Sequence, residues 1–185
     1  MQPADTEALA GFYNGLSKAS MRTFRPLGTE TTADDCLKLA LNNGVEKDTR
    51  FDLLALAGPR VVGWCFLWDL DTDKPMFGLG IADDHHGRGL GGTLMDRVMQ
   101  AARDRRLERV LLTVVKDNVV AWRLYEKRGF VSYDEYVSKD DGETYLRMAC
   151  SLRCNRALSA PYAAAETGLL TTEHTEITDG DRDWT

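Results

Sequence analysis

The sequence predicts an α/β fold with a central mixed sheet and helices on both faces of that sheet. Apolar stretches with the length of strands are separated by amphipathic stretches with the length of helices. An unbroken run rich in β-branched residues, Arg109 to Val115, is typical of a buried strand. In addition, residues 76–105 follow the order strand, glycine-rich loop, helix.

Composition narrows the class of protein. The chain has 185 residues, of which 43% are hydrophobic and 28% charged, as expected for one soluble globular domain. Its net charge of −6 gives no sign of a nucleic-acid-binding surface, and no apolar run reaches the length of a membrane span. The N-terminal residues lack the features of a signal peptide, and the four cysteines lack zinc spacing. We therefore expect a cytoplasmic protein with no metal, nucleic-acid or membrane partner.

Two helices are expected in the N-terminal part of the chain. Apolar residues at three- and four-residue steps predict a helix over Thr6 to Lys18, followed by a linker over Ala19 to Gly28. Thr32 is the expected cap of a second helix, which has acidic residues in its first turn. Asn42-Asn43-Gly44 is expected to end that helix.

Three strands are expected next. Phe51 to Ala57 and Val61 to Leu70 are expected to pair as a hairpin across the turn Gly58-Pro59-Arg60. The polar segment Asp71 to Pro75 then turns the chain into a third strand, Met76 to Ile81.

The remaining elements follow the glycine-rich loop. A helix is expected from Gly91 to about Arg105, followed by the buried strand Arg109 to Val115. A second helix is expected from Asn118 to Arg128, and Gly129 is expected to end it. The last two strands, Phe130 to Ser138 and Thr144 to Cys150, are expected to pair around an Asp140-Asp141-Gly142 turn. We expect residues 1–151 to form the domain. Residues 152–185 are expected to be an extension of unknown role that is not needed for cofactor binding.

The loop His85-His86-Gly87-Arg88-Gly89-Leu90-Gly91-Gly92 carries the strongest functional signal. Glycines allow close approach of the backbone to a ligand, and a helix N-terminus offers unpaired N–H groups and a positive dipole end. Together they suit a phosphate or pyrophosphate. The loop lacks the Gly-Lys-Ser/Thr of a P-loop and the glycine spacing of a Rossmann motif. A simple helix-entry turn is the alternative interpretation.

This loop resembles the acyl-CoA loop of the GNAT superfamily of N-acetyltransferases, R/Q-x-x-G-x-G/A, over His86 to Gly91. His86 stands where the family usually has Arg or Gln, a residue that mainly contributes its backbone. A second segment, Asn118 to Phe130, resembles the later family motif N-x-x-A-x-x-L-Y-E-K-x-G-F. One helix and one strand fit between the two motifs. The resemblance extends from about Arg60 to Ser151.

The resemblance implies a mostly antiparallel sheet and acetyl-CoA as cosubstrate. It implies an N-acetyltransferase in which a primary amine attacks the thioester directly. Before the first predicted helix there is little or no room for the strand with which the family usually begins. The implied cofactor-binding residues are Leu79, Ile81, His86, Gly87, Arg88, Gly89, Gly91, Gly92, Thr93 and Asn118.

Three of the implied residues have alternative explanations. Arg88 is explained equally well as a solvated loop charge. Asn118 is expected to cap a helix whether or not it binds cofactor. The resemblance assigns Tyr125 as the general acid that protonates the leaving thiolate, and packing on an amphipathic helix is the alternative.

The general base is not identified by the sequence. Many relatives place a glutamate on the strand before the loop, where this chain has Gly78 and Gly80. The residues within reach are Asp69, Asp71, Asp83, Asp84 and His85, and each is more simply explained as a solvated or turn residue. A water chain is the alternative base.

Several functional questions stay open from the sequence. The acceptor is a small amine, an amino acid, an antibiotic or a protein lysine, and neither a longer acyl chain nor a homodimer is excluded. A non-catalytic CoA-binding regulatory module of the same fold is the alternative function.

Overall fold

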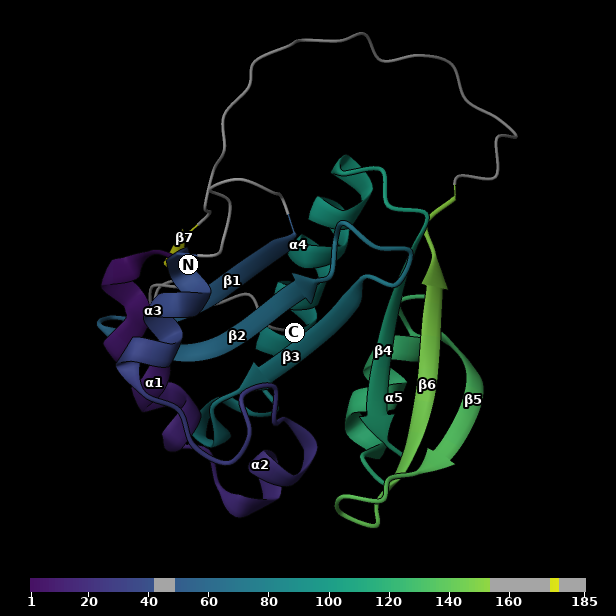
Figure 1. Cartoon of the computed structure of the whole chain (residues 1–185), viewed down its shortest axis with the longest axis horizontal. Helices are drawn as coiled ribbons and strands as arrows, with labels where there is room; N and C mark the ends of the chain where they lie inside the picture. Colours follow the sequence, from purple (N-terminus) through teal and green to yellow (C-terminus); the bar gives the residue numbers. More distant parts are fainter. Residues whose placement is uncertain (42–48, 154–173, 177–185) are drawn as a thin grey trace, which may run out of the picture.

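The computed structural model describes residues 1–41, 49–153 and 174–176. Its sheet has the strand order β5-β6-β4-β3-β2-β1-β7 (Figure 1). The strands are β1 Arg50–Ala57, β2 Arg60–Trp68, β3 Met76–Ile81, β4 Arg109–Val115, β5 Val131–Val137, β6 Thr144–Ser151 and β7 His174–Glu176. The predicted helix stop at Asn42-Asn43-Gly44 and most of the predicted extension lie outside the described residues.

Helices cover both faces of the sheet, which confirms the predicted α/β class. Helices α1 and α3 lie on one face, and α4 and α5 lie on the other (Figure 1). The helices are α1 Thr6–Asn14, α2 Lys18–Thr23, α3 Ala33–Leu41, α4 Leu90–Asp104 and α5 Val119–Glu126, with short 3-10 turns η1 Pro3–Asp5 and η2 Asp83–His85.

The sheet is mixed and mostly antiparallel, as expected. Strands β1, β2 and β3 form one antiparallel meander, and β4, β6 and β5 form a second antiparallel group. The two groups meet where β3 runs parallel to β4. In the described part of the chain no strand precedes α1, in line with the missing leading strand. The edge beside β1 is occupied instead by β7, which pairs in parallel with Leu54 to Leu56.

The first predicted helix is wrong in its extent. It was expected to reach Lys18, but α1 ends at Asn14, and Gly15 is its C-cap. The segment expected to be a linker contains α2. The Ser17 side chain accepts a hydrogen bond from the Ser20 N–H and so starts this new helix instead of continuing α1.

Most of the other boundaries agree with the sequence to within two or three residues. Thr32 caps α3 as predicted, since its hydroxyl accepts the Asp35 N–H at 3.1 Å. The second strand ends at Trp68 and not at Leu70. Gly129, with φ of 86°, lies just beyond α5 in the left-handed conformation expected of a helix stop.

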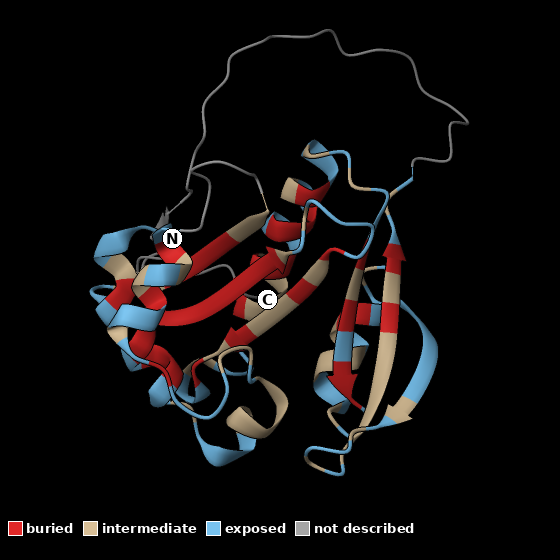
Figure 2. Cartoon of the chain, viewed as in Figure 1, coloured by how far each residue is buried: buried red, intermediate tan, exposed pale blue. Residues whose placement is uncertain are grey.

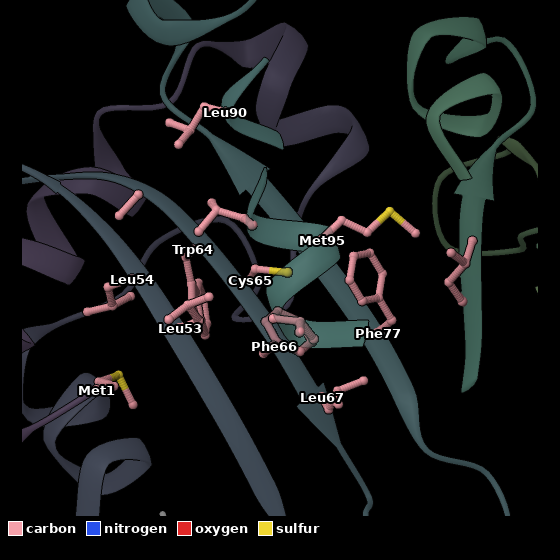
Figure 3. Packing of buried hydrophobic residues seen from close by; sticks show 14 of the residues in the cluster. Met1, Leu53, Leu54, Trp64, Cys65, Phe66, Leu67, Phe77, Leu90 and Met95 are labelled. Atoms are coloured by element: carbon pink, nitrogen blue, oxygen red, sulfur yellow. The ribbon is translucent and has the colours of Figure 1, made fainter. Parts of the chain in front are cut away.

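The core lies mainly between β1–β3 and the helices on either side (Figure 2). On one face of β2, Trp64 and Phe66 form an aromatic cluster with Phe24. On the other face, Cys65 and the neighbouring residues of β3 and α4 fill the space beneath the helix (Figure 3). This packing fixes the end of β3 and the start of α4, the two elements that the glycine loop joins.

A buried carboxylate organises the hairpin of β1 and β2. Asp52 is 2% exposed, and its Oδ1 accepts the indole N–H of Trp64 at 2.9 Å and that of Trp68 at 3.3 Å. The Arg50 guanidinium stacks 4.1 Å from the Trp68 ring, with its Nε 3.6 Å from Asp52 Oδ2. Burial raises the pKa of the Asp52 carboxyl above its usual value.

We expect Asp52→Ala to lower the free energy of unfolding by about 2–4 kcal/mol, because it leaves two indole donors without their acceptor and a buried guanidinium without its counter-charge. Urea unfolding measures this change. Asp52→Asn is the matched control, since it keeps an oxygen for both indoles and should cost less. Equal losses in the two variants would contradict this explanation.

Candidate active site

The site begins where β3 and β4 part. Met76 and Leu111 form a single registered pair among the described residues, and the Leu111 N–H donates to the Pro75 carbonyl at 2.8 Å. Beyond this point the two strands diverge (Figure 1). A cleft of about 1000 Å³ opens between them and extends to the glycine loop and α5.

The exposed edge of β3 offers backbone groups to this cleft. The Ala82 N–H donates to the Val62 carbonyl at 2.9 Å, so the even-numbered residues of β3 bond to β2. The backbone groups of Leu79 and Ile81 therefore point away from β2, toward the gap. The Ile81 carbonyl accepts from His86 Nε2 at 2.9 Å. In the part of the chain that the structure describes, the Ile81 N–H and both Leu79 backbone groups have no partner and are left for a ligand.

The glycine loop presents a row of backbone donors. Amide N–H groups from Gly87 to Gly91 have no acceptor among the described residues. Gly87 and Gly89 adopt φ of 74° and 80°, a conformation that strongly favours glycine. Gly89 is also the N-cap of α4, so the positive end of that helix faces the same region. Loop and helix together form an anion-binding site of the predicted kind.

Nine of the sequence-predicted residues line the cleft. They are Leu79, Ile81, His86, Gly87, Gly89, Gly91, Gly92, Asn118 and Tyr125. Arg88 and Thr93 are not among the lining residues. The Gly92 N–H already donates to the Gly89 carbonyl at 2.9 Å, so it is not a free donor. Leu90 also lines the cleft, and its N–H has no acceptor among the described residues. It was not among the residues predicted from the sequence, because its apolar side chain gives no sign of a ligand contact.

Helix α5 forms the opposite wall. Asn118 caps it as predicted, with its side chain accepting the Ala121 N–H at 3.2 Å. Tyr125 is 7% exposed, with ring centroids 5.8 Å from Phe77 and 6.1 Å from Phe130. Its hydroxyl has no hydrogen-bond partner among the described residues. Burial raises the pKa of the Tyr125 phenol above its usual value, so the phenol keeps its proton at neutral pH.

The face of β3 toward α2 has no room for a side-chain base. A Cβ at Gly78 would lie 2.1 Å from the Phe66 ring, and one at Gly80 would lie 2.3 Å from the Phe24 ring. Aromatic rings therefore fill the space that a glutamate on this strand would need.

Helix α2 is fastened to the end of β3 by one carboxylate. Asp83 accepts hydrogen bonds from the Ser17 N–H at 2.9 Å and from the Ser17 and Ser20 hydroxyls at 2.7 and 2.8 Å. These donors, those of Ser17 above all, lower the pKa of Asp83 to about 2. Asp83 lines the cleft but is a weak base for that reason.

The other end of α2 reaches the second half of the sheet. Arg22 binds Asp117 at 2.6 Å and Glu143 at 2.7 Å, and Arg25 pairs with Asp141. We call residues 17–25 the α2 strap, because its two ends contact opposite sides of the cleft. Its contacts were not predicted, since they join residues far apart in the sequence.

No group of three or more His, Cys, Asp or Glu side chains suited to a metal ion occurs in the described residues. Within those same ranges no helix has the length and apolar character to cross a membrane.

Residues 14–130 match the model of the acetyltransferase (GNAT) family. The chain belongs to this family, which confirms the resemblance carried by the two motifs. The expected enzyme class, an N-acetyltransferase, is the class of that family.

Two curated relatives illustrate the range of similarity. The chain is 36% identical over 86 residues to the mycothiol acetyltransferase of Corynebacterium aurimucosum, a match that covers 44% of this chain and 28% of that protein. It therefore spans little more than a quarter of that relative. It is 28% identical over 129 residues to the uncharacterized N-acetyltransferase YycN of Bacillus subtilis, covering 67% of this chain and 72% of the relative.

Solved structures share the fold at low sequence identity. A GNAT acetyltransferase from Streptococcus pneumoniae superposes with a TM-score of 0.68 at 22% identity, covering 82% of this chain and 95% of that one. The spermidine N-acetyltransferase of Vibrio cholerae, solved with CoA and spermine, gives 0.69 at 19% identity, covering 82% and 92%. YncA from Salmonella typhimurium, solved with acetyl-CoA, gives 0.67 at 19% identity, covering 89% and 96%.

Arg22→Gln should loosen one end of the α2 strap, because it removes the contacts with both Asp117 and Glu143 and leaves only the Arg25–Asp141 pair there. We expect several-fold faster amide hydrogen exchange in residues 17–25. Arg147→Gln is the matched control, since it removes the Arg147–Asp134 ion pair of another hairpin region. Unchanged exchange in the strap would show that Asp83 and the Arg25–Asp141 pair hold it without Arg22.

Proposed function

We propose that this chain transfers an acetyl group from acetyl-CoA to a primary amine, which attacks the thioester directly. The observation that carries this proposal is the row of unpaired N–H groups from Gly87 to Gly91 at the cleft. Such a row, at the start of α4, suits the pyrophosphate of CoA. Family membership and the open edge of β3 support the same assignment.

The remaining cofactor contacts follow the edge of the cleft. We propose that the pantetheine arm lies along β3, where Leu79 and Ile81 have free backbone groups, and that Asn118 lies on its other side. The loop from His86 to Thr93 then surrounds the phosphates. Arg88 does not line the cleft, but its guanidinium is a candidate partner for one of the phosphates.

The chemical step needs a proton for the leaving thiolate. When the amine nitrogen bonds to the carbonyl carbon, the C–S bond breaks and sulfur leaves with the electron pair. Tyr125 is the proposed donor, because its phenol lines the cleft, is protonated at neutral pH and has no other hydrogen-bond partner among the described residues.

The acceptor side of the cleft favours some amines over others. Among the described residues, Asp83 and Asp117 are the carboxylates that line the cleft, and each is already held by donors from the α2 strap. A polyamine would have to compete with these contacts for its counter-charges. We therefore propose an acceptor with one amino group, such as an amino acid, an amino sugar derivative or a lysine side chain.

The alternative is a CoA-binding module without turnover, which the absence of a side-chain base on β3 favours. Release of free thiol from acetyl-CoA, measured with a panel of amines that includes spermidine, separates the two. Amine-dependent release supports the enzyme. CoA binding with no release across the panel supports the module.

We also propose that residues 1–151 form the acyltransferase domain and that the extension 152–185 is not needed for cofactor binding. Both motifs lie within the domain. Strand β7 lies at the outer edge of the sheet, with β1 and β2 between it and β3.

Gly89→Val should weaken CoA binding by at least roughly ten-fold, because a side chain at this left-handed position disturbs the row of donors. Isothermal titration with CoA measures the affinity. Gly58→Val is the matched control, since Gly58 also has positive φ but lies in the β1–β2 turn. The pyrophosphate assignment fails if a folded Gly89→Val variant binds CoA as tightly as the Gly58→Val variant.

Tyr125→Phe removes only the hydroxyl, so folding and CoA affinity should remain close to wild type. We expect the turnover number to fall by roughly ten- to a thousand-fold, since water replaces the phenol poorly as an acid. Tyr133→Phe, on the exposed face of β5, is the control. Wild-type turnover in Tyr125→Phe, when chemistry limits the rate, would make Tyr125 a packing residue. A loss confined to KM would indicate a binding role.

A further inference from the structure

Two basic side chains of the cleft lack a counter-charge in the part of the chain that the structure describes. The lining of the cleft includes three basic residues, Arg22, Arg123 and Lys127. Arg22 is paired with two carboxylates of the second half of the sheet. The side chains of Arg123 and Lys127, by contrast, form no hydrogen bond or ion pair with any described residue. The Arg123 guanidinium borders only the neighbouring Trp122 ring, 5.8 Å from its centroid.

These two cations lie on the same side of the last turn of α5. They are four residues apart, so their side chains leave the helix in nearly the same direction, and both are exposed. Like charges at this spacing repel each other and cost a helix some of its stability. Glu126, the acidic residue of the same helix, is paired with neither of them. In a chain whose net charge is −6, the pair is a local excess of positive charge.

The turn of α5 that carries this pair lies against the start of α4. Arg128 donates from Nε and Nη2 to the Asp96 carboxylate of α4 at 2.7 and 3.0 Å. A Cβ on Gly91 would lie 3.7 Å from the Leu124 side chain. The two cations, which neighbour Leu124 and Arg128 in the chain, therefore border the first turn of α4, where the phosphates of CoA are proposed to bind.

The chemistry of CoA offers one anionic group for this position. The amides of the glycine loop already supply donors for the pyrophosphate. Beyond the pyrophosphate the molecule continues into an adenosine whose ribose carries a phosphate monoester on its 3′ oxygen. This monoester has a charge of about −1.5 to −2 at neutral pH, like the phosphate of a phosphoserine. Because Arg123 and Lys127 are exposed and border the phosphate site without belonging to the loop, they suit the end of the cofactor that leaves the cleft.

We propose that Arg123 and Lys127 bind the 3′-phosphate of CoA, so that this chain distinguishes CoA from 3′-dephospho-CoA. The inference rests on one part of the proposed function, the binding of CoA at the glycine loop. A guanidinium can hold two oxygens of a phosphate at once, and a lysine ammonium adds a flexible point charge. A phosphate between the two side chains would also relieve their mutual repulsion on the helix.

The test measures the affinities of CoA and 3′-dephospho-CoA by isothermal titration at low salt. The full chain is used as wild type, Arg123→Gln, Lys127→Gln, the double variant and Arg103→Gln. We expect the wild type to bind CoA roughly five- to twenty-fold more tightly than dephospho-CoA. Each single substitution should reduce this preference by roughly two- to five-fold, the range of one exposed ion pair, and the double variant should nearly abolish it. The affinity for dephospho-CoA should stay unchanged in every variant.

The controls separate this site from other roles of the same residues. Arg103 is an exposed cation in the last turn of α4 and does not line the cleft, so Arg103→Gln should keep the preference. Lys127→Arg retains the charge and should keep it as well. Loss of the preference in Arg103→Gln would indicate a general effect of net charge. Equal weakening of both ligands by Arg123→Gln and Lys127→Gln would assign these residues to the pyrophosphate, and unchanged affinities would make them solvated charges. Each of these three results overturns the inference.

Phosphorus NMR provides a second measurement, on the bound ligand itself. A phosphate monoester titrates at a pH of about 6, and adjacent cations favour its dianion. The pKa of the 3′-phosphate should therefore be lower in the complex with wild type than in free CoA, and the double variant should lose most of this shift. A 3′-phosphate that titrates alike when free and when bound would contradict the site. Wild type that binds neither CoA nor dephospho-CoA would refute the proposed cofactor, whereas wild type that binds both equally tightly would refute the 3′-phosphate site alone.

Discussion

Backbone hydrogen bonding at the point where β3 and β4 part is the constraint on which the rest of the site depends. Parallel strands normally satisfy each other's N–H and C=O groups, and here they stop doing so after a single registered pair. The groups left over on Leu79 and Ile81, together with the amides of the glycine loop, need partners from water or from a ligand. The cofactor side of the cleft is thus formed mainly by main-chain atoms, and its side chains serve chiefly to support that backbone.

The opened sheet is braced at both ends of the cleft. At one end, β3 and β4 still pair through Met76 and Leu111, and at the other end the α2 strap joins the two halves. Phe24, at the end of α2, lies against Gly80, so the same short helix fills the strand face that would otherwise carry a base.

Local pattern was enough to predict most of the fold. The strands, the glycine loop and the Asn118 cap each depend on residues within a few positions of one another, and such patterns report local geometry well. The α2 strap escaped prediction for the opposite reason: Arg22 meets Glu143, and nothing in the spacing of either residue indicates the other. The Ser17 cap is visible in the sequence, but the apolar period of the first helix runs up to Leu16, so the predicted end of that helix was placed too late. The free amide of Leu90 was missed because its side chain gives no signal, although its backbone does the same work as that of the neighbouring glycines.

The position of β7 has a consequence for how the molecule is made. Strand β1 receives its inner partner, β2, from residues that follow at once, but its outer partner comes from His174–Glu176. Because the ribosome synthesises the chain from the N-terminus to the C-terminus, the residues of all the other strands emerge before those of this outer strand. Until then the edge of β1 is a bare row of peptide groups, open to pairing with a neighbouring nascent chain. The outer edge of β1 can be closed only after these C-terminal residues have been synthesised.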